Sequence, residues 1–171
     1  IFAMSISDIL FSLGILASPF VGPRDNPDAL FAMGSIEACE AFGFLFLLGI
    51  QCLLLYTLFL TYYFMKRIKY KITPQTFTNR EEKYVHFFIC SLSISLALSA
   101  LVTGNINSQN MGSVCDIGSY PYQCDQSIDM VCQRGGKYST KVLAAYGGIC
   151  GAVCFVLLIV VLTLSTHHVY L

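Results

Sequence analysis

Residues 36–65 read IEACEAFGFLFLLGIQCLLLYTLFLTYYFM, an apolar run whose only charged residues lie in its first two turns. A helix of about 20 apolar residues crosses a bilayer core about 30 Å thick. This run is longer than that, so we expect the helix to tilt or to project beyond the lipid. It lacks the alternation of polar and apolar residues that is typical of a membrane barrel strand.

The rest of the chain is also rich in apolar residues and poor in charged ones. Of its 171 residues, 56% are hydrophobic and 12% are charged, and the formal net charge is zero, whereas soluble domains have about 25% charged residues. Three more segments are long enough to span a membrane: 1–20, 84–103 and 142–164. We therefore predict an all-α transmembrane helix bundle with four spans in a single domain, 1–171, surrounded by membrane lipid. The balanced charge argues against a nucleic-acid partner.

The basic residues predict the orientation of the spans. Lysine and arginine gather in the connection 66–83, which begins with Lys66, Arg67, Lys69 and Lys71. Short loops rich in these residues stay in the cytoplasm. The connections 21–35 and 104–141 then face outward, and we expect a multi-pass protein of the plasma membrane.

Four cysteines lie on the outer side of this topology: Cys39, in the first turn of the second span, and Cys115, Cys124 and Cys132 in the long outer connection. Disulfides persist in such an oxidising space. Four cysteines allow three pairings, and the sequence does not choose among them. We favour Cys39 with Cys115 and Cys124 with Cys132. The bridges either only staple a polar loop or hold it over the outer mouth of the bundle as a lid.

Polar residues inside the spans are the next candidates. Asp8 lies within the first span and Gln51 within the second. An ionisable side chain inside a membrane is costly and usually faces a partner or a watery cavity. We interpret Asp8, and more weakly Gln51, as an intramembrane polar site, with a purely structural helix contact as the alternative. Ser95 and Ser99 form a small-x-x-x-small pair, which permits close helix approach.

Motifs of catalysis and of metal binding are absent from the sequence. The three histidines are scattered, and there is no H-E-x-x-H, no G-x-S-x-G and no glycine-rich phosphate loop. We therefore expect no enzyme activity, no metal and no cofactor.

Three stretches together resemble the seven-helix G-protein-coupled receptors. They are SISDIL (5–10), CEAFGFLFLLGIQ (39–51) and GSVCDIGSYPYQCDQSIDMVCQRGGKY (112–138). The last is similar to the second outer loop of the divergent receptor-like proteins of diatoms and other microalgae. Residues 61–71, TYYFMKRIKYK, stand where rhodopsin-like receptors carry D-R-Y, which also favours a divergent group. The resemblance covers nearly the whole chain, as a fragment with receptor helices two to five.

The resemblance implies the function. It implies a bridge from Cys39 to the outer loop, an Asp8 that couples ligand to activation, and a turn at 65–83 that faces a heterotrimeric G protein. The protein would sense an unknown extracellular ligand and signal to the cytoplasm. The alternatives are a four-span scaffold of the tetraspanin kind, whose C-C-G motif is missing here, and a transporter or channel fragment, which Asp8 suits equally well.

Overall fold

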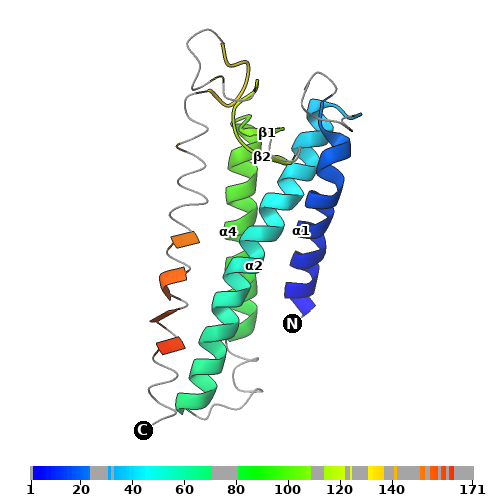
Figure 1. The fold of residues 1–171 in the computed structure, drawn as a ribbon. Helices are drawn as coiled ribbons and strands as arrows, with labels where there is room; N and C mark the ends of the chain where they lie inside the picture. Colours follow the sequence, from blue (N-terminus) through cyan, green and yellow to red (C-terminus); the bar gives the residue numbers. More distant parts are fainter. Residues whose placement is uncertain are drawn as a thin grey trace.

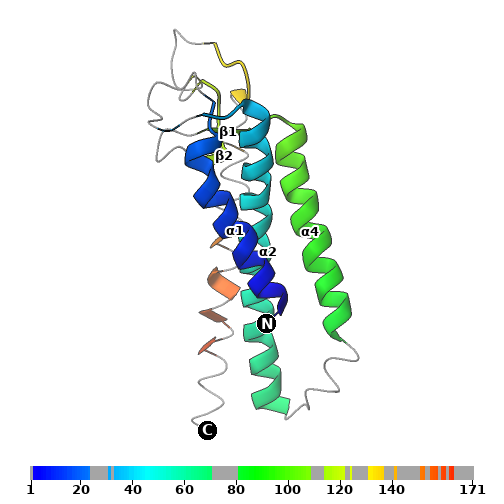
Figure 2. The same cartoon turned by 90° about the vertical axis from the view of Figure 1, so that its right-hand side faces the viewer.

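Three long helices form the body of the molecule in the computed structural model: α1 (Phe2–Val21), α2 (Ile36–Tyr70) and α4 (Lys83–Val102). The central helix, α2, packs against both α1 and α4 (Figures 1 and 2). The structure describes residues 2–23, 31, 33–70, 81–108, 114–121, 124, 131–136, 141, 151–152, 155–157, 159–160 and 162–163.

All three helices are long and apolar enough to cross a membrane. A helix is the natural solution there, because it satisfies its backbone hydrogen bonds within itself. With 35 residues, α2 is about 52 Å long at about 1.5 Å per residue, which exceeds the hydrocarbon core of about 30 Å. The chain is therefore a membrane-embedded helical protein.

The predicted span boundaries differ from the observed helices mainly at one place. The apolar run predicts that the second span ends at residue 65, but α2 continues to Tyr70. Its last turns include Arg67 and Lys69, and basic side chains are favourable at a helix C-terminus because they complement the helix dipole. The expected connection 66–83 thus begins as helix. The fourth predicted span, 142–164, lies largely outside the described residues, so four spans remain a prediction and three are found.

Close packing between α1 and α2 depends on two glycines. A Cβ atom at Gly14 would lie 2.8 Å from the Phe46 Cα, and a Cβ at Gly49 would lie 2.8 Å from the Phe11 Cα. Only a hydrogen atom fits at such separations, so each glycine lets the opposite backbone approach. The expected small-residue contact is different: Ser95 and Ser99 on α4 are exposed.

The start of α2 and the end of α4 are both capped by local hydrogen bonds. Ser35 precedes α2, and its Oγ accepts a hydrogen bond from the Ala38 N–H at 3.3 Å, as expected for an N-cap serine. After α4, Gly104 adopts φ 65°, and the Asn105 N–H donates back to the Ala100 carbonyl at 3.1 Å. A left-handed residue with this bond closes a helix and turns the chain.

A short antiparallel hairpin follows, which an all-α prediction did not include. It consists of β1 (Ile106–Ser108) and β2 (Cys115–Ile117), with Ile106 opposite Ile117 and Ser108 opposite Cys115. Ile106 and Ile117 are buried in one cluster with Leu47 of α2. The hairpin therefore packs against the N-terminal part of α2 (Figure 1).

Candidate functional site

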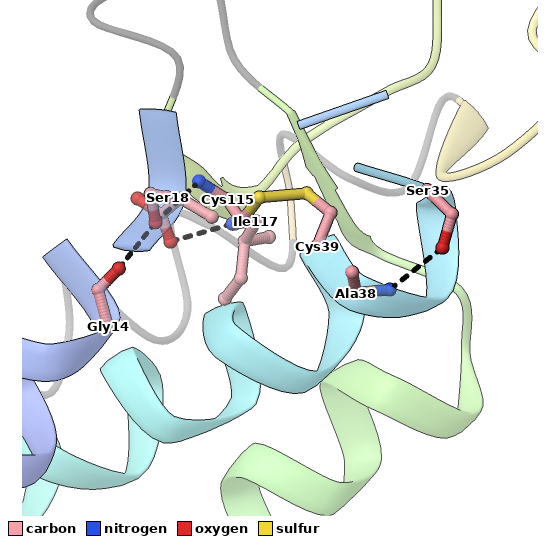
Figure 3. The surroundings of a disulfide bond; sticks show 8 residues. Gly14, Ser18, Ser35, Ala38, Cys39, Cys115 and Ile117 are labelled. Carbon is pink, nitrogen blue, oxygen red and sulfur yellow. Dashed lines mark hydrogen bonds between the residues drawn. A yellow bond between two sulfur atoms is a disulfide. The ribbon is translucent and has the colours of Figure 1, made fainter. Parts of the chain in front are cut away.

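Cys39 and Cys115 form a disulfide that joins the hairpin to α2 (Figure 3). Cys39 lies in the first turn of α2 and Cys115 begins β2. Their Cα atoms are 5.4 Å apart, and the two residues are 1% and 0% exposed. The second disulfide joins Cys124 to Cys132. This is the connectivity favoured among the three open to the sequence, and we call this end of the molecule the disulfide end.

Ser18 connects α1 to Cys115 by a hydrogen bond. Its Oγ donates to the Gly14 carbonyl at 2.5 Å and accepts a hydrogen bond from the Cys115 N–H at 3.3 Å (Figure 3). Ser18 is 0% exposed, and a buried N–H group without a partner is costly. The start of β2 is thus fixed to α2 by a covalent bond and to α1 by a hydrogen bond.

Space for the hairpin is provided by Gly43 of α2. A Cβ atom at Gly43 would overlap the Ile106 side chain and lie 2.9 Å from the Cys115 carbonyl oxygen. A larger residue would therefore lift the hairpin from the helix.

An ion pair makes a further contact between the connection 104–141 and α2. The Arg134 guanidinium is paired with the Glu40 carboxylate, one residue after Cys39. The Tyr120 N–H donates to the Arg134 carbonyl at 2.9 Å, so the segment around Arg134 also pairs with the chain after β2. We call residues 105–108, 114–121 and 131–136 the cap.

Asp116 is the carboxyl group within the described residues of the cap. Burial raises the pKa of this carboxyl, and the opposing influence is the Ile117 N–H, which donates to the Asp116 Oδ1 at 2.6 Å. One hydrogen bond to the charged form does not compensate for the loss of water around it.

The two intramembrane polar residues do not come together. Asp8 is exposed on α1, whereas Gln51 is buried in α2 at 7% exposure. Among the described residues, no hydrogen bond or ion pair involves Asp8. A carboxylate on the exposed face of a membrane helix is unfavourable in lipid. The face of α1 that carries Asp8 is therefore less apolar than an ordinary lipid-facing surface.

The basic residues of the expected coupling face are in different environments. Lys66 forms an ion pair with Glu81 at 2.8 Å and lies over the Tyr62 ring at 5.0 Å. Arg67 is exposed, Lys69 lies in the last turn of α2, and Lys71 lies outside the described residues. We call this end, marked by Lys66 and Arg67, the basic end.

A polar chain near the basic end was not predicted. The Tyr56 hydroxyl is 2.9 Å from His86 Nδ1 and 3.7 Å from Cys90 Sγ, and His86 Nε2 is 3.5 Å from the Glu82 carboxylate. Tyr56 is 5% exposed although it carries a polar group. The spacing of Glu82 and His86, one helical turn apart, was visible in the sequence, but the partner on α2 was not.

Within the described part of the chain, no group of three or more His, Cys, Asp or Glu residues is placed so that it could hold a metal ion.

Comparisons with protein-family models, with curated proteins and with solved structures find no match for this chain.

Proposed function

We propose that the protein is a receptor-like membrane protein of the G-protein-coupled kind, which senses an extracellular ligand beneath the cap and signals at the basic end. The observation that carries the proposal is the Cys39–Cys115 bridge. It fixes the connection after α4 across the start of α2, and the Ser18 hydrogen bond adds α1 to the same junction. The cap, which follows α4, is therefore bonded to both α1 and α2 at Cys115.

A receptor of this kind has more helices than the three found here, and Asp8 supports the proposal that further helices pack against α1. Its carboxylate is exposed on α1, and a charged group near the centre of a membrane helix costs about 3 kcal/mol on insertion scales. A bundle in which additional helices cover this face would give Asp8 polar partners and remove it from lipid. In such a bundle Asp8 would lie inside, where it could bias the equilibrium between two helix packings.

The basic end supports the signalling part. With 35 residues, α2 extends beyond the hydrocarbon core and carries Arg67 and Lys69 in its last turn. These side chains are placed where a cytoplasmic partner with an acidic surface could reach them. The proposed partner is a heterotrimeric G protein, and the proposed location is the plasma membrane.

The test is nucleotide-sensitive association with a G protein. The protein is co-expressed with a panel of heterotrimeric G proteins, and resonance energy transfer between protein and Gα subunit is recorded in membranes with and without GTPγS. We expect association with one class that GTPγS reverses, and a several-fold weaker signal after combined replacement of Lys66, Arg67, Lys69 and Lys71 by glutamine. The matched control is Lys141→Gln, in the long outer connection, which should leave the signal unchanged.

Two results would contradict this proposal. If no class of G protein associates in a nucleotide-sensitive way, the receptor proposal fails, and the four-span scaffold and the transporter become the better hypotheses. If association occurs but the quadruple variant matches the wild type, the coupling face has been assigned wrongly.

A further inference from the structure

Two hollows open at the side of the bundle, and of their lining residues the receptor proposal uses Arg67 and no other. The larger has a volume of about 370 Å³ and the smaller about 190 Å³. Both are lined by Ala3 of α1 and Tyr56 of α2, so they are adjacent. We call the pair the lateral groove: α2 forms its floor, and α1 and α4 form its walls. In Figure 2 the N-terminal part of α1 passes in front of α2 at this level, and α4 lies to the right.

The half of the lateral groove in the middle of the helices is apolar. Leu10 of α1, Leu48 of α2 and Ile94 of α4 line it together. Its surface thus has the chemistry of a hydrocarbon chain, and its position is at the depth of lipid tails. An acyl chain in this half would contact all three helices.

The half at the basic end carries two opposite charges. Arg67 at the end of α2 and Glu82 before α4 both line it. Within the described part of the chain they form no ion pair with each other, and Arg67 has no carboxylate partner. Glu82 is 3.5 Å from His86 Nε2. The groove therefore presents a guanidinium and a carboxylate to one hollow.

Aromatic side chains complete this polar half. Phe59, Tyr63 and Phe64 of α2 line the same hollow as Glu82. Ring faces attract ammonium groups, and a carboxylate nearby strengthens the attraction. Guanidinium groups, in turn, match phosphate oxygens geometrically.

We propose that the lateral groove binds a membrane phospholipid with a zwitterionic headgroup. The headgroup phosphate lies at Arg67, the ammonium lies at Glu82 among the aromatic rings, and one acyl chain follows the apolar half past Tyr56. A purely anionic headgroup would leave the Glu82 carboxylate without a cation, and a polypeptide helix would leave both charges unmatched unless it carried the opposite pair at the same height. The proposal shares Arg67 with the receptor proposal, but it needs no extracellular ligand and no G protein, and Glu82 belongs to the lipid proposal alone.

The experiment compares two lipids that share the phosphate and differ in the ammonium. The purified protein is incorporated into nanodiscs that contain equal amounts of phosphatidylethanolamine and phosphatidylglycerol with identical acyl chains, and retained lipid is measured by native mass spectrometry after release. We expect the wild type to retain phosphatidylethanolamine in excess. Arg67→Gln should lower retention of both lipids about fivefold, the factor for one basic residue at a charged membrane surface. Glu82→Gln should reverse the preference in favour of phosphatidylglycerol.

Lys83→Gln is the matched control, because Lys83 is exposed at the same end and does not line the hollow. It should leave both retention and preference as in the wild type. The proposal is overturned if the wild type prefers phosphatidylglycerol or shows no preference, if it retains no lipid, or if Lys83→Gln has the same effect as Arg67→Gln. Arg67 is exposed, so its replacement does not remove a buried contact, and circular dichroism of each variant verifies the helix content.

Discussion

The Ser18 hydroxyl of α1 accepts a hydrogen bond from the backbone N–H of Cys115 at 3.3 Å, although the residues are 97 positions apart in the sequence. The same hydroxyl donates to the Gly14 carbonyl one turn earlier. A single buried oxygen therefore connects α1 to the strand that the disulfide holds on α2, and the cap is tied to two helices by different kinds of bond.

Replacement of Ser18 by alanine should loosen this junction. The Cys115 N–H would remain buried without an acceptor, which destabilises by about 1–3 kcal/mol. We expect a lower melting temperature of the protein in nanodiscs and faster hydrogen exchange at residues 114–117. Ser12→Ala is the control, since Ser12 is exposed on the same helix and should have little effect. Equal effects of both variants would show that the Ser18 hydrogen bond does not support the cap.

Removal of the two disulfides should have unequal consequences. Cys39 and Cys115 are 76 positions apart, and Cys124 and Cys132 are 8 apart. A bridge that closes a longer loop restricts the unfolded chain more, by about 4–5 kcal/mol against about 2–3 in the chain-entropy picture. The Cys39→Ser, Cys115→Ser double variant should therefore lose more thermal stability than the Cys124→Ser, Cys132→Ser variant. Equal losses, measured in the same nanodiscs, would contradict the assignment of the first bridge as the main tie.

Asp116 should make the stability of the cap depend on pH. Burial raises the pKa of this carboxyl above its ordinary value of 3.8, so the folded cap binds the proton more tightly than the unfolded chain does. The stabilisation from proton uptake is complete below the ordinary pKa and is lost as the pH rises through the folded value. Asp116→Asn keeps an oxygen that can accept from the Ile117 N–H but has no charge.

We therefore expect Asp116→Asn to be more stable than the wild type at pH 7. Unlike the wild type, the variant should not gain stability from proton uptake as the pH is lowered. Asp116→Ala serves as the control, because it also removes the charge but loses the acceptor for Ile117, and it should be less stable than the asparagine variant. Melting temperatures between pH 3 and pH 8 measure both effects. If the wild type instead loses stability on acidification relative to Asp116→Asn, the direction of the pKa shift is wrong.

The helices could be predicted from the sequence because each depends on its own composition. The apolar runs identified α1 and α4 to within one residue at each end, whereas the predicted end of the second span, residue 65, falls five residues before the end of α2. In a membrane an apolar run of this length has few alternatives to a helix. The predicted location of four cysteines on one side of the membrane favoured disulfides among them, but the choice among three pairings needed the distances between them.

The cap and the lateral groove could not be predicted, because they depend on contacts between distant residues. Each strand of the hairpin has only three residues, too few for a periodic signal, and the hairpin depends on the bridge and on burial of Ile106. Tyr56 and His86 are 30 positions apart, and Glu40 and Arg134 are 94 apart. No local pattern indicates such pairs. Asp8 was noticed as an unusual residue, but its position on the exposed side of α1 required the helix orientation.

Exchange of the two charges between Glu40 and Arg134 should restore part of the stability that the ion pair gives to the cap. Both side chains are partly buried, so removal of one charge leaves the other poorly solvated, and Glu40→Arg should destabilise the cap by about 1 kcal/mol or more. The double variant Glu40→Arg, Arg134→Glu should regain part of this loss. Lys83→Glu, a charge reversal at an exposed position at the other end of the bundle, is the control. Thermal unfolding of the single and double variants gives the coupling energy, and a value of zero would show that the pair does not hold the cap.

Gly49 should tolerate no side chain. A Cβ atom there would lie 2.5 Å from the Phe11 backbone nitrogen and 2.8 Å from the Phe11 Cα, and neither backbone can move without separating α1 from α2. Overpacking of this kind destabilises by about 1–3 kcal/mol, so Gly49→Ala should lower the melting temperature by several degrees. A Cβ atom at Gly151 would meet no atom of the described residues within 4 Å, and Gly151→Ala should be neutral or slightly stabilising, because alanine favours the helix. If both alanine variants behave alike, the close approach of α1 and α2 at Gly49 does not stabilise the bundle.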